Sequence, residues 1–221
     1  MNPARPGRGA CLIVPFMILA LLMALPRSFA VASPEASRPR TVDTTRVTIY
    51  QPVLASAAKT RSQAGFCWTE SIALPRRNVW RCMSGNAIYD PCFATPALTG
   101  AVICGANPGR HEAGFVMHLS KPLPQSTAPL NTRTPWMVKL ADGSVCSRLT
   151  GTIPFVGGQA LPLACSDSSG CTGGDCRHMT GLSDDLRRGK LWIAHKFVYS
   201  SGRAGLKLLG RDEVPVAVVW H

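Results

Sequence analysis

The stretch WMVKLADGSVCSRL, residues 136–149, decides the fold class that the sequence predicts. Two short runs rich in β-forming residues, 136–140 and 145–149, flank the segment Ala141-Asp142-Gly143-Ser144. Asp-Gly between such runs is a strong hairpin signal, because both residues accept the backbone angles of a tight turn. The stretch therefore predicts two antiparallel strands joined by this turn.

Similar short β-rich runs, separated by Gly or Pro, continue along the chain from about residue 63. Runs of this length and composition are typical of strands in antiparallel sheets. We expect such strands at 101–104, 114–119, 161–165, 191–199 and 214–220, with one more upstream at 46–50.

Only Leu182 to Arg188 has the pattern of a helix. Ser183 stands where an N-cap would stand, acidic residues follow it, and basic residues precede Gly189. The predicted fold class is therefore all-β, a disulfide-stapled sandwich or open barrel with one or two short helices.

The N-terminal region has the layout of a secretory signal peptide. A basic start precedes a mostly apolar run, Cys11 to Leu25, and Ala30-Val31-Ala32 fits the cleavage pattern, although cleavage after Ala30 fits nearly as well. The run is about 15 residues long and contains Pro15, so it is shorter than the roughly 20 residues of a membrane-spanning helix. We expect an exported protein, periplasmic or extracellular, with no transmembrane segment after cleavage.

The expected organisation has three parts. Residues 1–32 form the signal peptide, and 33–62, rich in Ser, Ala, Thr, Pro and Arg, form a flexible spacer. Residues 63–221 form a single disulfide-bonded β domain.

Nine cysteines are present, and Cys11 lies in the signal peptide. An even set of eight in an exported chain indicates a disulfide framework. Because eight cysteines allow about 105 pairings, the sequence does not fix the connectivity. Sequential pairing is our working expectation: Cys67 with Cys82, Cys92 with Cys104, Cys146 with Cys165, and Cys171 with Cys176.

The formal net charge of +12 favours anionic partners such as phospholipid headgroups, lipopolysaccharide or wall polymers. The basic residues are scattered and are not interleaved with stacking aromatics, so no specific nucleic-acid groove is predicted. The expected partner is an anionic envelope polymer or a protein. Basic positions include Arg76-Arg77, Arg81, Arg110, Arg148, Arg187-Arg188, Lys190, Lys196, Arg203, Lys207 and Arg211.

Cys67, in AGFCWTES (64–71), invites comparison with the nucleophile of papain-like peptidases. His195 lies at nearly the spacing of a partner base, but Pro75 prevents the long helix that such a cysteine would open. No asparagine follows His195 to orient its imidazole. A disulfide is therefore the favoured state of Cys67.

The histidines do not form a recognisable metal motif. His111-Glu112 begins like H-E-x-x-H, but the next histidine is His118, and Gly114 argues against a helix there. A local disulfide between Cys171 and Cys176 is favoured over a metal loop with His178. A site in which His111, His118, His178, His195 or His221 converge stays open, but the prediction is no metal and no cofactor.

Residues 78–93, NVWRCMSGNAIYDPCF, form the most distinctive segment. Its turn-forming residues between two cysteines predict a tight, stapled turn. In the functional alternative, this turn presents a recognition surface. The candidate binding residues are Trp80, Asn86, Tyr89 and Asp90.

The chain resembles a family of exported, disulfide-bonded bacterial proteins of unknown function. The matching residues are Cys67-Trp68-Thr69, Trp80-Arg81-Cys82, Gly85 to Phe93, Cys104, Pro122-Leu123-Pro124, Leu140 to Cys146 and Val219-Trp220. The resemblance implies a secreted, disulfide-bonded module and carries over no activity, cofactor or catalytic residue. The Cys171 to Cys176 loop is an addition to this pattern.

Three functions are compatible with these features. The first is a non-catalytic binding module of the envelope or extracellular space, with no catalytic residue. The second is a secreted inhibitor of a hydrolase, presenting Gly85 to Pro91 or the Cys171–Cys176 hairpin. The third is a small hydrolase that uses Cys67 with His195, or a metal held by His111, Glu112 and His118.

Overall fold

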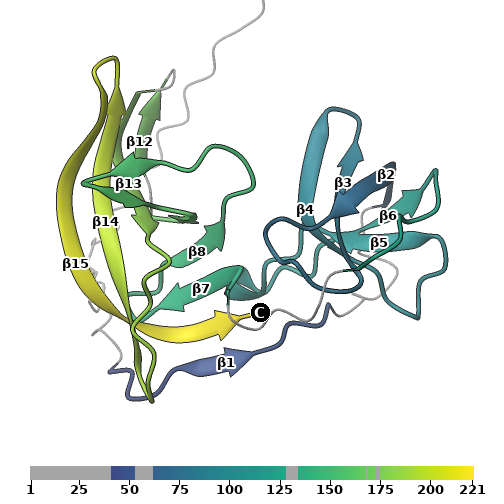
Figure 1. Ribbon diagram of the computed structural model, residues 1–221, viewed down its shortest axis with the longest axis horizontal. Coiled ribbons are helices and arrows are strands. Elements are labelled where there is room, and N and C mark those ends of the chain that lie inside the picture. Colours follow the sequence, from purple (N-terminus) through teal and green to yellow (C-terminus); the bar gives the residue numbers. More distant parts are fainter. Residues whose placement is uncertain (1–40, 53–61, 128–133, 168, 173–174) are drawn as a thin grey trace, which may run out of the picture. The chain divides into compact units, whose positions relative to one another are not determined.

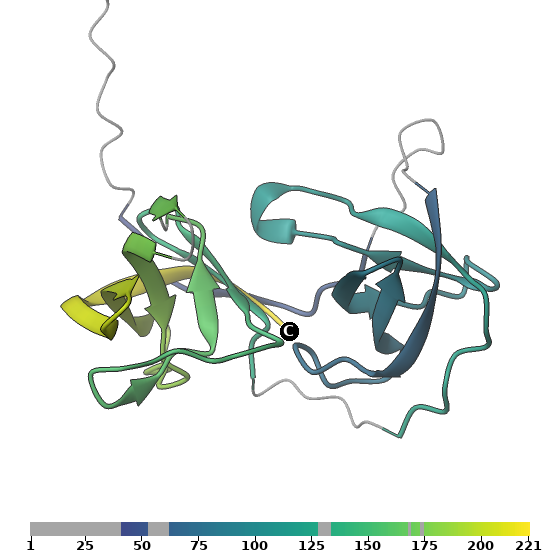
Figure 2. The ribbon, with the colours of Figure 1, turned by 90° about the horizontal axis from the view of Figure 1, so that it is seen from above.

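The computed structural model describes residues 41–52, 62–127, 134–167, 169–172 and 175–221 (Figure 1). For 169–172 and for 175–176 only the backbone is described. The expected signal peptide lies outside these residues, as does most of the expected spacer. The described chain is nearly all β, which confirms the predicted fold class. Its strands form two main groups, blue to teal for β2 to β6 and green to yellow for β7 to β15 (Figure 2).

The first group is a closed five-stranded barrel. Neighbouring strands pair antiparallel in chain order, and a parallel pairing of β2 with β6 closes the barrel. Gly85, at φ 56°, lies in the turn between β3 and β4 and adopts a conformation that other residues disfavour. The strands are β2 (Ser62–Glu70), β3 (Val79–Ser84), β4 (Ala87–Phe93), β5 (Ala101–Cys104) and β6 (Phe115–Leu119).

A close approach across the first barrel explains one glycine inside a strand. A Cβ placed on Gly65 would lie 2.3 Å from the carbonyl oxygen of Met83 and 2.6 Å from Sδ of Met117. Only glycine lets β2 pass this close to its neighbours.

The second group is an eight-stranded sheet, in which six antiparallel strands form a ring closed by the pairing of β15 with β7. We call this ring the six-stranded sheet. The predicted hairpin at 136–149 is present as β7 and β8, and Gly143 in its turn has φ 91°. The six strands are β7 (Met137–Leu140), β8 (Val145–Arg148), β11 (Leu163–Cys165), β13 (Asp175–Leu182), β14 (Trp192–Gly202) and β15 (Gly205–Trp220).

Four short strands complete the described structure. β1 (Arg46–Thr48) falls within the predicted run 46–50 and pairs in parallel with the end of β15, and β12 (Ser169–Thr172) pairs with β13. β9 (Phe155–Val156) and β10 (Gln159–Ala160) form a small hairpin.

The prediction of a helix from Leu182 to Arg188 is wrong. Leu182 ends strand β13, and Arg187 forms a β-bridge with Ile193. Leu186 is buried in the core of the six-stranded sheet, so tertiary packing overrides the local capping pattern. The only helical element in the described ranges is the 3-10 helix η2 (Pro108–Arg110).

Three disulfides join Cys67 to Cys82, Cys92 to Cys104, and Cys146 to Cys165. Each joins residues directly opposite one another on adjacent antiparallel strands. These are three of the four expected pairs. The backbone of Cys171 is paired with that of Cys176, but their side chains lie outside the described part of the structure.

No helix within the described ranges has both the length and the apolar character needed to cross a membrane.

Candidate functional site

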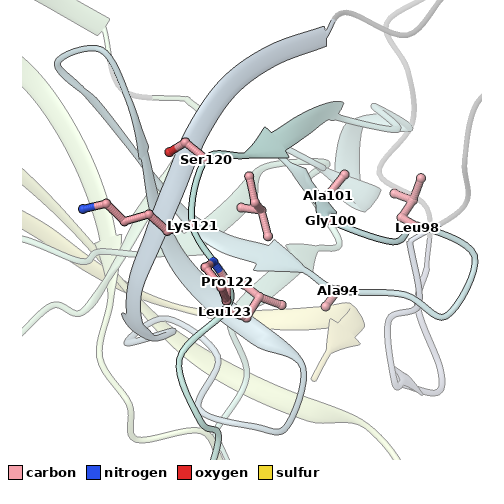
Figure 3. Close-up of a pocket in the computed structure, with 9 residues that line it drawn as sticks. Ala94, Leu98, Gly100, Ala101, Ser120, Lys121, Pro122 and Leu123 are labelled. Atoms are coloured by element: carbon pink, nitrogen blue, oxygen red, sulfur yellow. The ribbon is translucent and has the colours of Figure 1, made fainter.

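One hollow of the described surface is an open, apolar pocket of about 450 Å³ beside β5 and β6. Pro122 and Leu123 contribute to its lining, while Lys121 is directed away from the other lining residues (Figure 3). The Nζ of Lys121 lies 4.9 Å from the ring centroid of Phe66. Because its only cation is turned away, this pocket offers little beyond apolar contact.

A second hollow is larger, with a volume of about 670 Å³, and is basic. We call it the basic cleft. Among the described residues, its lining contains two arginines and no acidic side chain, so the local charge of these residues is positive. The lining residues are Ile49, Gln51, Pro52, Arg76, Arg77, Asn78, Val79, Phe93, Ala94, Thr95 and Pro96.

Arg76 is held rigidly at one side of the basic cleft. Its guanidinium donates to the main-chain oxygens of His221 at 3.1 Å and Tyr50 at 2.5 Å, and it lies 5.7 Å from the ring centroid of Phe93. Burial lowers the pKa of this guanidinium, although a group with so high an ordinary pKa stays charged at neutral pH. Arg76 therefore provides a fixed positive charge.

Arg77, next to Arg76 in sequence, is exposed, and Asn78 beside it adopts φ 63°. The carbonyl oxygen of Asn78 accepts a hydrogen bond from the Ala94 backbone at 2.8 Å, which fixes this turn against the end of β4. Ile49, which is half exposed, adds apolar surface. The cleft thus combines a fixed cation, an exposed cation and apolar contact area.

A third hollow, about 270 Å³, is polar and contains two of the predicted binding residues, Tyr89 and Asp90. Glu112 and Arg148 also line it, so its charges are mixed. Trp136 is buried in its wall, and the indole nitrogen of Trp136 has no hydrogen-bond partner among the described residues.

Asp90 is buried, with a side chain that is 1% exposed. The Ser71 hydroxyl donates to one of its carboxylate oxygens, the Ile72 backbone donates to the other at 3.0 Å, and the nearest Arg81 nitrogen is 4.0 Å away. Burial raises the pKa of Asp90, and these interactions offset only part of that effect. Asp90 thus fixes the loop at 71–72 against strand β4.

The four predicted binding residues do not form one surface. Trp80 is 3% exposed and belongs to the core of the first barrel. Asn86 is exposed in the β3–β4 turn, and the ring of Tyr89 packs edge-on against Phe115 at 4.9 Å. Only Tyr89 and Asp90 line the same hollow.

The residues of the thiol and metal hypotheses lie on different elements. Cys67 is bonded to Cys82 and carries no thiol in this structure, while His195 lies on β14 of the other strand group. His111 caps η2, His118 lies on β6 and His178 on β13. Only Cys82, Cys92 and Cys104 bring three possible ligand atoms within 4.8 Å of one another in the described chain, and all three are in disulfides.

One polar cluster was not foreseen from the sequence. Lys196, on β14, donates to Asp142 at 2.8 Å, to Asp167 at 2.5 Å and to the Ser144 hydroxyl at 3.1 Å. Burial alone would raise the pKa of each carboxyl, but the bonds from Lys196 outweigh it and hold both pKa values below their usual range. Every charge in this cluster has a close partner, which indicates a structural role.

No family model, curated protein or solved structure matches the chain. The candidate site therefore rests on its geometry and charge alone.

Proposed function

We propose that this protein is an exported, non-catalytic binding module that holds an anionic segment of an envelope polymer in the basic cleft. The observation that carries the proposal is the pairing of Arg76 and Arg77 in the basic cleft, whose described lining residues include no acidic side chain. The three disulfides support an oxidising compartment.

The size and chemistry of the cleft suit a short polymer segment. Its volume lies within the roughly 300–1,000 Å³ typical of ligand sites. Arg77 can form paired hydrogen bonds with a phosphate or carboxylate group, and the fixed charge of Arg76 adds attraction. Ile49, Pro52 and Pro96 supply apolar surface on which the carbon skeleton of a polymer unit can pack.

The lining also favours binding over turnover. Among the described residues that form the cleft, none has a carboxylate, thiol or imidazole side chain. These groups are the usual sources of general acid, general base or nucleophilic catalysis. A site built from arginine, amide and apolar side chains is suited to holding an anion.

The test is substitution of the exposed arginine. Binding of poly(glycerol phosphate), a soluble phosphate polymer, is measured by calorimetry for the unchanged protein, Arg77→Ala and Arg110→Ala. Arg110 is also exposed but lies on η2, so its loss changes the net charge equally away from the cleft. We expect Arg77→Ala to weaken binding about tenfold or more, because a charge-assisted hydrogen bond is lost.

Equal weakening by the two substitutions would show that net charge, and not the cleft, governs binding. Binding of neutral dextran as tightly as the phosphate polymer would contradict the requirement for an anion.

A specific observation also keeps the inhibitor hypothesis as a second candidate. The β3–β4 hairpin ends in the exposed turn at Gly85 and Asn86, and Ile88 beside it is 48% exposed. Both strands carry cystines, which would limit the flexibility of this loop. Inhibition of a lysozyme or a protease by the unchanged protein, without polymer binding, would favour this function.

A further inference from the structure

Several exposed apolar side chains lie near the turn of the β14–β15 hairpin, which is the long curved pair of strands in Figure 1. Leu206, Leu208 and Leu209 are 42%, 40% and 51% exposed, and Phe155 on the adjacent β9 is 67% exposed. β9 contacts β15, and a Cβ placed on Gly157 would lie 2.9 Å from Cδ2 of Leu208. We call residues 202–211, with Phe155, the hairpin tip.

The hairpin tip is also cationic. The segment 202–211, GRAGLKLLGR, contains Arg203, Lys207 and Arg211, all exposed, and no acidic residue. The Arg211 guanidinium lies 5.2 Å from the ring centroid of Phe197. Within the described ranges no ion pair involves Arg203 or Lys207. The tip therefore combines exposed apolar side chains with unneutralised positive charge.

This combination identifies one class of partner. Single exposed apolar residues are common, but a group of four on neighbouring strands indicates an interaction surface. The surface of an anionic bilayer offers acyl chains to the leucines and phosphates to the cations. A second copy of the chain would bring like charges together, and so fits less well.

The edge of β15 also disfavours a protein strand as partner. Residues 205–214 pair only with β14, which leaves the other edge of β15 open in the described structure. A register shift in the pairing with β14 leaves Leu209 as an extra residue between Leu208 and Gly210, and Lys207 and Arg211 lie on the same strand. Bulges and cations on an edge strand are common protection against the addition of another strand.

We propose that the hairpin tip binds the surface of an anionic phospholipid bilayer. Leu206, Leu208 and Phe155 enter the boundary between headgroups and acyl chains, while Arg203 and Lys207 remain at the phosphates. The tip lies at the interface and does not cross the bilayer, because its open edge must keep its backbone groups hydrated. This site is separate from the basic cleft.

The test measures cosedimentation with vesicles of equal parts phosphatidylglycerol and phosphatidylcholine, and with phosphatidylcholine alone. We expect binding to the anionic vesicles only, and weaker binding at high salt. Arg203→Gln/Lys207→Gln should weaken binding roughly 25-fold, about fivefold for each cation. Leu206→Ser/Leu208→Ser should weaken it about tenfold, through lost apolar burial.

Ile72→Ser is the apolar control, because Ile72 is 52% exposed in the loop between β2 and β3. This variant should bind vesicles as the unchanged protein does, and thermal unfolding of every variant shows that it is folded. Equal loss in the control, or equal binding to both kinds of vesicle, would overturn the proposal. A dimer seen in equilibrium sedimentation and abolished by the leucine substitutions, without vesicle binding, would also overturn it.

Arg77→Ala separates this inference from the proposed function. We expect it to bind anionic vesicles normally while losing the phosphate polymer. Loss of vesicle binding in Arg77→Ala would place lipid recognition in the cleft and contradict the role of the hairpin tip.

Discussion

The two strand groups stabilise closed sheets by different means. The five-stranded barrel, with strands of 4 to 9 residues, contains two disulfides whose sulfurs lie together in its core. The six-stranded sheet has one disulfide with described side chains, and it includes strands of 11 and 16 residues. Short strands bury less apolar surface, so covalent links contribute more to the first group.

The acidic groups with shifted pKa values differ between the two regions in the direction of the shift. Asp90, with its nearest arginine nitrogen at 4.0 Å, has a raised pKa because burial dominates. Asp142 and Asp167 have lowered pKa values because Lys196 lies at 2.8 and 2.5 Å. The side chain of Asp90 is 1% exposed, whereas those of Asp142 and Asp167 are 41% and 36% exposed, so weaker burial and a closer cation together reverse the direction of the shift.

The largest expected effect tests the covalent contrast. The double variants Cys67→Ala/Cys82→Ala and Cys92→Ala/Cys104→Ala each remove one disulfide of the barrel. Each should lower the free energy of unfolding by about 3 kcal/mol, the cost expected for loops of this length. Reduction of all disulfides should therefore unfold β2 to β6 first. Hydrogen exchange of the reduced protein should show rapid exchange there, with protection retained in β14 and β15.

The Cys146→Ala/Cys165→Ala variant provides the control in the other region. Its loss of stability should be similar in size, but hydrogen exchange should leave β2 to β6 protected. Loss of protection in both regions at once, after any single pair is removed, would show that the two regions unfold as one unit.

A smaller effect tests the charge contrast. Lys196→Met leaves two neighbouring carboxylates without their cation and should cost about 2 kcal/mol at pH 7, because both are partly exposed and can recruit water. Lys190→Met, at an exposed position, should change the free energy of unfolding by less than about 0.5 kcal/mol. Urea unfolding of both variants measures the difference.

The shifted carboxyl pKa values predict how the stability loss of Lys196→Met changes with pH. The lowered pKa values of Asp142 and Asp167 contribute stability above the ordinary carboxyl pKa of about 4, and it is lost as pH falls through the lowered values. Asp90 acts oppositely: its raised pKa favours folding at low pH, and this contribution is lost as pH rises through the raised value. The deficit of Lys196→Met should thus shrink towards pH 3; a constant deficit would contradict the assigned ion pairs.

The smallest expected effect compares two turn glycines, one in each region. Gly85 and Gly157 have φ of 56° and 58°, but a Cβ on Gly85 meets open space whereas one on Gly157 meets Leu208. Replacement by alanine should cost about 1 kcal/mol at Gly85, from the backbone conformation alone. At Gly157 the cost should be a few tenths of a kcal/mol larger, because the added Cβ meets Leu208. Urea unfolding measures both losses, and a larger loss at Gly85 would show that the contact with Leu208 is unimportant.

Local pattern was sufficient for strands made mostly of buried apolar residues. The hairpin at 136–149 and the strand at 101–104 follow from apolar runs and turn residues. By contrast, residues 205–213 of β15 are rich in glycine and charge, because that edge faces solvent, and only pairing with β14 makes them a strand. The helix expected from Leu182 to Arg188 is absent because tertiary packing overrides the local pattern there as well: Leu186 is buried in the core.

The candidate site was less accessible to sequence reasoning than the fold. Arg76-Arg77 stood out only as one basic pair among several, and its convergence with Ile49 and Phe93 depends on tertiary structure. Trp80 was distinctive in sequence because it packs in the core of the first barrel, and Asp90 because its carboxylate holds the loop at 71–72. A residue can thus stand out in a short sequence motif because it has a structural role, and not because it binds a ligand.

The sequential order of the cystines has a consequence for how the protein is made. In each disulfide described here, a cysteine is joined to the next cysteine along the chain, 12 to 19 residues later. An oxidant that joins thiols in their order of emergence from the ribosome or a secretion channel would produce the native pairs without reshuffling. β1 behaves differently, because it must remain unpaired until β15, synthesised about 170 residues later, arrives beside it.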